Sequence, residues 1–109
     1  MSVVMFSQED SFYVRKAVFR MILRRAKIEL DDRTDIEELE IAELGEGISL
    51  FRLPDGQRSR IGDALLHGAQ KLRSDVTAGN PTEEPVREGI ESVLEDLIEF
   101  MTTRLQAAE

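Results

Sequence analysis

Residues 11–30, SFYVRKAVFRMILRRAKIEL, constrain most strongly what this chain can fold into. At about 100° per residue, the apolar side chains of this stretch fall into two adjoining arcs of a helix and leave only a narrow polar strip. That polar surface contains Tyr13 and four cations, which we call the basic strip: Lys16, Arg20, Arg24 and Lys27. Because a helix that is apolar over most of its circumference must be packed on several sides, we predict a central helix that ends near Glu29.

Shorter patterns flank this predicted helix. Ser7 followed by Asp10 fits an N-cap with an acidic first turn, and the polar residues 31–35 end the helix. The apolar run at residues 3–6 fits either a buried strand or a leader that packs onto the helix.

Residues 36–53 allow two interpretations. Alternation around Ile41, followed by the Gly45-Glu46-Gly47 turn pattern, predicts a β-hairpin with strands 38–44 and 48–53. Thr34 with Glu37 instead fits a capping box that begins a short helix over 34–44. We favour the hairpin, and expect the Pro-Asp-Gly sequence at 54–56 to form the turn after its second strand.

Two further helices are predicted. Ser59 caps the first, over 60–75, where Gly62 and Gly68 lie at the margin of an apolar stripe and allow another helix to approach closely. A linker follows at 77–85, although Asn80-Pro81 also resembles a helix start. The last helix runs over 86–106.

The last helix combines two opposite faces. Its wide apolar arc contains Val86 and Val93 together with six residues that we expect at an oligomer interface: Ile90, Leu94, Leu97, Ile98, Met101 and Leu105. Its acidic stripe consists of Glu88, Glu91, Glu95 and Glu99. We therefore predict a mostly helical α+β fold in one domain, 1–109, with a central N-terminal helix, a small β-hairpin and two further helices; the alternative is an all-α bundle.

Charge is strongly segregated along the chain. The net charge is −8 over 109 residues, yet residues 1–28 hold six bases and two acids, and residues 29–46 hold nine acids and one arginine. Fields of opposite sign can steer a charged partner or a second copy of the chain, whereas the net sign argues against general nucleic-acid binding. The absence of cysteine excludes disulfides and thiol chemistry.

These patterns predict a non-enzymatic protein-interaction module, an adaptor, chaperone or immunity-type inhibitor, which acts as a homodimer. Helices 11–29 and 86–106 present more apolar surface than one small domain readily covers, and a two-fold dimer is the commonest way to bury the excess. The basic strip and the acidic stripe are the predicted partner-binding residues. We expect no catalytic residues, no metal or other cofactor, no membrane association and a cytoplasmic location.

Two other functions are compatible with the sequence. The spacing of Glu37 with Glu40, and of Glu88 with Glu91, is similar to that of the paired carboxylates in all-α nucleotide pyrophosphohydrolases, which implies magnesium-dependent hydrolysis. Alternatively, the basic strip binds an anionic ligand or nucleic acid and the protein is a regulator. His67 follows Asp63 at helical spacing, but no nucleophile accompanies it, so we interpret it as an exposed surface histidine.

Overall fold

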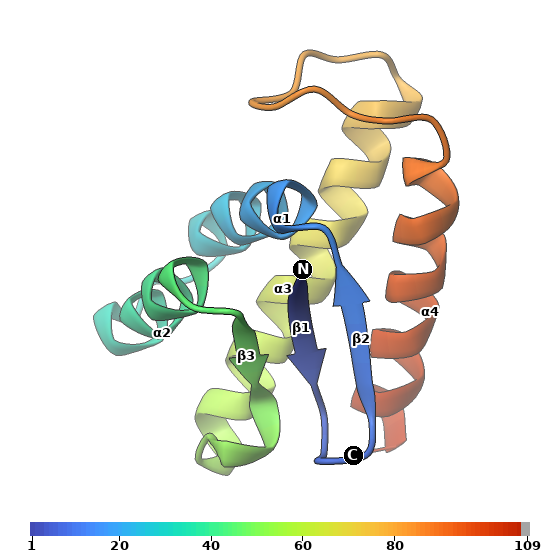
Figure 1. Ribbon diagram of the computed structural model, residues 1–109. Coiled ribbons are helices and arrows are strands. Elements are labelled where there is room, and N and C mark those ends of the chain that lie inside the picture. Colours follow the sequence, from blue (N-terminus) through green and yellow to red (C-terminus); the bar gives the residue numbers. More distant parts are fainter. Residues whose placement is uncertain (108–109) are drawn as a thin grey trace.

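The structure, a computed structural model that describes residues 1–107, confirms a mostly helical α+β fold (Figure 1). Its elements follow the chain in this order: β1 (Ser2–Met5), β2 (Ser11–Val14), α1 (Lys16–Ile28), α2 (Arg33–Leu44), β3 (Gly47–Ser49), a 3-10 helix (Leu50–Arg52), α3 (Asp55–Thr77) and α4 (Ile90–Ala107). Among the described residues, none of the helices combines the length and apolar character that crossing a bilayer requires.

A three-stranded sheet of order β2-β1-β3 lies in front of α3 in Figure 1. The central strand β1 pairs antiparallel with β2 and parallel with β3, so that Val4 lies beside Phe12 on one side and beside Ile48 on the other. Val4 and Ile48 are buried, which places this face of the sheet against the helices. The side chains alternate across a sheet, so Tyr13 lies on the opposite face, where it is 62% exposed.

The first turn of the predicted N-terminal helix is a strand instead. The N–H of Phe6 donates to the carbonyl of Asp10 at 2.8 Å and closes a turn that folds β2 back onto β1. Ser7 therefore belongs to this turn and caps no helix, and its hydroxyl accepts from the N–H of Glu9 at 3.3 Å. The run at residues 3–6 is mostly strand, and pairing with it overrides the helical periodicity of residues 11–14.

The predicted hairpin at 38–44 and 48–53 is wrong, because residues 33–44 form α2. Its N-cap is Asp32, which accepts hydrogen bonds from the N–H groups of Thr34 and Asp35 at 2.8 and 3.4 Å. Leu39 is fully buried at helical spacing from Ala42. The short strand β3 begins at Gly47, the second glycine of the turn pattern, but its partner is β1, more than forty residues earlier in the chain.

The third helix begins earlier than predicted, at Asp55 rather than residue 60, and it lies between α1 and α4. Proline presets a helical φ, and the carbonyl of Pro54 accepts from the N–H of Arg58 at 2.8 Å, so the expected turn at 54–56 is the helix start. The role predicted for the two glycines is confirmed. A Cβ at Gly68 would lie 2.6 Å from the carbonyl oxygen of Ile22 on α1, and one at Gly62 would lie 2.7 Å from Leu105 on α4.

The fourth helix begins later than predicted, at Ile90 rather than residue 86. Gly89 has a φ of +89°, which is not a helical conformation, so the helix can begin only after this residue. Asn80 and Pro81 do not begin a helix either, because the N–H of Asn80 donates to the carbonyl of Asp75 at 2.9 Å and ends α3. The linker is therefore longer than predicted and covers residues 78–89.

The core confirms that α1 is heavily buried, with six of its residues contributing: Val18, Phe19, Met21, Ile22, Leu23 and Ala26. α3 and α4 supply much of the rest, and Phe100 on α4 packs its ring against those of Phe6 and Phe12, at 5.6 and 5.4 Å between centroids. The helix that contacts both α1 and α4 is α3, so the N-terminal helix shares the central position with it.

Candidate functional site

The β2–α4 groove is a hollow of about 590 Å³ between the end of β2, the start of α1 and the first turns of α4. In Figure 1 the tip of β2 points toward the start of α1, with the first turn of α4 beside it and the linker above. The groove is lined by Met1 and by residues 13–15, 17–18, 84–90 and 93. Its size falls within the range of about 300–1,000 Å³ that is usual for binding pockets.

Exposed apolar side chains gather at this groove. Met1, Tyr13, Val86 and Val93 are 79, 62, 39 and 40% exposed, and all four line the groove. They are four of the seven large apolar side chains that are exposed among the described residues; the other three lie on α1 and α2. Since exposed apolar side chains that cluster around a hollow are typical of binding surfaces, the groove is the candidate functional site.

Cations predominate at the rim of the groove, although the protein as a whole is acidic. Arg15 and Arg87 line the groove, Lys16 follows directly in the chain, and all three are exposed without an ion pair to any other described residue. Glu88 is an exposed anion of the same rim. Glu84 is the other carboxylate in the lining, and its charge is offset by Arg20 at 3.5 Å.

The linker wall of the groove is held in place by Arg25 of α1. This guanidinium donates to Asp75 on α3 at 3.1 Å and to both carboxylate oxygens of Glu83 in the linker at 2.9 and 3.0 Å. Hydrogen bonds from Asn80, and then from Arg25 and Lys71, hold the pKa of Asp75 below its usual value. The hydrogen bond from Arg25 likewise lowers the pKa of Glu83.

These ion pairs predict a loss of stability in acid. The pKa of Asp10 is also lowered, by its hydrogen bond from Arg104. A carboxyl whose pKa is lower in the folded state stabilises the protein above its unfolded pKa, about 4, and this stabilisation is lost as the pH falls further. The thermal midpoint should therefore fall as the pH is lowered from about 5 toward 2. The midpoint of the Glu83→Gln variant should fall less steeply with pH than that of wild type. If the thermal midpoints of both proteins decreased equally with pH, Glu83 would not contribute to the acid-sensitive stability.

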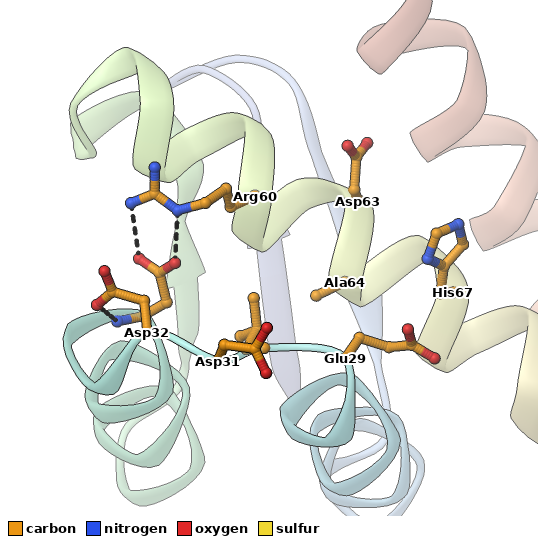
Figure 2. A pocket seen from close by; sticks show the side chains of 9 residues that line it. Glu29, Asp31, Asp32, Arg60, Asp63, Ala64 and His67 are labelled. Atoms are coloured by element: carbon orange, nitrogen blue, oxygen red, sulfur yellow. Dashed lines mark hydrogen bonds and ion pairs between the residues drawn. The ribbon is translucent and has the colours of Figure 1, made fainter.

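A second hollow, the acidic pocket of about 470 Å³, lies between the α1–α2 turn and α3 (Figure 2). The carboxylate of Asp35 is buried here and accepts from the Nε and Nη2 atoms of Arg60 at 2.7 and 3.2 Å. Asp32 caps α2, and the carboxylate of Asp63 points away from the turn that carries Glu29. No set of three metal-binding side chains converges anywhere in the described part of the chain. The structure therefore explains two carboxylates of this pocket, those of Asp32 and Asp35, by the hydrogen bonds they accept within the fold.

His67 lines the edge of the acidic pocket and is exposed, as interpreted from the sequence. The paired carboxylates of the hydrolase hypothesis are not brought together. Arg33 lies 3.4 Å from Glu37 and 3.7 Å from Glu40 on α2, whereas Glu88 precedes α4 and Glu91 lies in its first turn. Figure 1 places α2 and α4 on opposite sides of the molecule.

Three of the eight predicted partner-binding charges pair with another described element of the chain, and the other five are exposed. In the basic strip, Arg20 pairs with Glu84, and Lys27 lies 3.8 Å from Glu43, while Lys16 and Arg24 are exposed. In the acidic stripe, Glu95 pairs with Arg73 at 2.7 Å. The remaining three carboxylates of the stripe are exposed: Glu88, Glu91 and Glu99.

The apolar arc of α4 faces inward. Ile90, Leu94, Leu97 and Met101 are 8, 0, 1 and 1% exposed, and Ile98 and Leu105 are partly buried. Within one chain, α3 and the sheet already cover the four buried residues, and contact between copies through this arc stays a prediction. The apolar arc exceeds what three helices cover, and the sheet, whose pairings the local sequence does not show, contributes to its burial.

Comparison with known proteins yields no relative: no protein-family model, no curated protein and no solved structure matches this chain.

Proposed function

We propose that this protein is a non-enzymatic protein-interaction module that binds an apolar segment of another protein in the β2–α4 groove. The observation that carries the proposal is the gathering of Met1, Tyr13, Val86 and Val93 around one hollow. Burying these side chains against a partner removes apolar surface from water, which is the main favourable contribution to protein association.

The different roles of charged residues in the fold and at the groove support the same function. Asp35, Asp75 and Glu83 bind arginines that join separate elements of the fold, so these carboxylates stabilise the structure. The groove, by contrast, leaves four apolar side chains and two arginines of its lining at the surface. Such a combination of an apolar centre and a charged rim is typical of protein interfaces.

Selection of a displayed library of random peptides on the immobilised protein tests the proposal. We expect apolar peptides to be enriched and to bind Val93→Glu at least about tenfold more weakly than wild type, because the variant places a charge in the groove. The matched control is Ile41→Glu, which changes an apolar side chain that is 62% exposed on α2, outside the groove. Failure to enrich any peptide, or equal loss of affinity in both variants, would contradict the proposal.

Self-association, including contact between copies through the arc of α4, stays a prediction. Sedimentation analysis of the free protein measures it directly.

A further inference from the structure

The free edge of β2 leads into the β2–α4 groove. In the sheet order β2-β1-β3, β2 has a neighbouring strand on one side only. The N–H of Val3 donates to Glu46 on the β3 side, so the alternation of backbone groups along β1 turns those of Ser2 and Val4 toward β2. Tyr13 lies opposite Val3, and its own N–H and carbonyl therefore point away from β1.

This orientation leaves strand-pairing groups beside an apolar hollow. No other described backbone group bonds the N–H or the carbonyl of Tyr13, and Tyr13 is one of the residues that line the groove. An extended peptide can satisfy these groups by pairing with the edge, and its side chains then alternate between the groove and the outer face of the sheet.

Charge specifies the composition of such a peptide. The edge strand continues directly into Arg15 and Lys16, and Arg87 lies across the groove in its other wall. These three cations exceed the single exposed carboxylate of Glu88 at the same rim. A peptide that carries carboxylates beside its apolar residues is attracted to this rim, whereas most of the surface of this protein, whose net charge is −8, repels it.

We infer that the partner segment is an extended, acidic and apolar stretch of polypeptide that adds to the free edge of β2 as a further strand. This inference rests on the proposed function and specifies its mode of binding. The backbone of the segment hydrogen-bonds to Tyr13, one apolar side chain enters the groove toward Val93, and a neighbouring carboxylate lies near Arg15 or Arg87. Affinity then comes from the main chain and the groove, and selectivity comes from the charge.

A series of backbone-methylated peptides tests the strand pairing. Starting from the tightest peptide of the display selection, analogues are made with a single N-methyl group at each position in turn. We expect methylation at alternate positions to weaken binding at least about tenfold, and methylation of the intervening positions to have little effect, because only every second N–H of a strand faces its neighbour. Loss of affinity without this two-residue period, or no loss at all, overturns the inference while the proposed function stands.

Charge variants test the composition. Arg15→Gln with Arg87→Gln should weaken binding of that peptide at least about tenfold at low salt and reduce its salt dependence, and the enriched sequences should contain Asp or Glu. The matched control is Arg52→Gln, an exposed arginine of the 3-10 helix outside the groove, which should bind normally. Equal affinity of the double variant and wild type overturns the acidic preference. If the free protein is a dimer that Tyr13→Pro dissociates, a second copy occupies the edge and the inference is overturned.

Discussion

Leu94→Ala should lower the free energy of unfolding by about 3 kcal/mol, the middle of the range for removing a buried leucine. Leu94 is fully buried in the single chain, where it belongs to the same core as residues of α1 and α3. Alanine would remove apolar contacts and leave a cavity that the surrounding helices fill only in part. Urea unfolding followed by circular dichroism measures the change.

The adjacent residue provides the control for this prediction. Val93 is 40% exposed on the groove side of α4, so Val93→Ala should change the free energy of unfolding by no more than about 0.5 kcal/mol. If the arc of α4 were a contact surface between copies, Leu94→Ala would instead weaken association and leave the unfolding of the monomer nearly unchanged. That result would support the interface predicted from the sequence.

The fold class could be predicted because apolar periodicity reports burial, and burial on one side is what each helix of this protein shows. The stripe of α3 and the arc of α4 are both inward-facing, as their spacing indicates. The close approaches at Gly62 and Gly68 could also be predicted, since a missing side chain at the margin of a stripe matters only where another helix passes.

The sheet could not be predicted, because one of its two pairings joins segments that are distant in sequence and the other uses residues that also fit a helix. The strand β1 pairs with β2 across a short turn and with β3 across more than forty residues. The local sequence pattern of each strand does not indicate which strand it pairs with. In addition, the apolar pattern of residues 11–14 fits both the 3.6-residue period of a helix and the two-residue period of a strand. Phe12 and Val14 fit a helical arc, yet they also share the inward face of a strand.

The β2–α4 groove was missed for a related reason. It combines residues 13–15 and 17–18 with residues 84–90 and 93, which the sequence patterns place in the N-terminal helix, the end of the linker and the last helix. Tyr13 did stand out as an aromatic residue in a polar strip, which is the one signal that the sequence contained. The predicted charge stripes were visible from spacing alone, whereas their partners, such as Glu84 for Arg20, depend on the path of the linker.

Gly47→Ala should destabilise the protein by about 3 kcal/mol, because it combines backbone strain with a steric clash. Gly47 has a φ of +146°, and a Cβ at this position would lie 1.9 Å from the carbonyl oxygen of Val3. Val3 belongs to the central strand, so the clash can be relieved only by moving β3 away from β1. The hydrogen bond from the N–H of Val3 to Glu46, 2.8 Å long, would break in the process.

Two measurements separate this effect from a general weakening of the fold. Amide exchange should accelerate most at Val3, whose N–H donates to the carbonyl of Glu46 directly before β3, and least at amides buried in α3, because the clash acts on the β1–β3 pair. Gly45→Ala is the matched control in the same turn. Its φ is −96° and the nearest atom to a new Cβ is 3.5 Å away, so its stability should stay within about 0.5 kcal/mol of wild type. Equal stability of both variants would mean that β3 is not held against β1, and the sheet that positions the free edge of β2 would then lack its third strand.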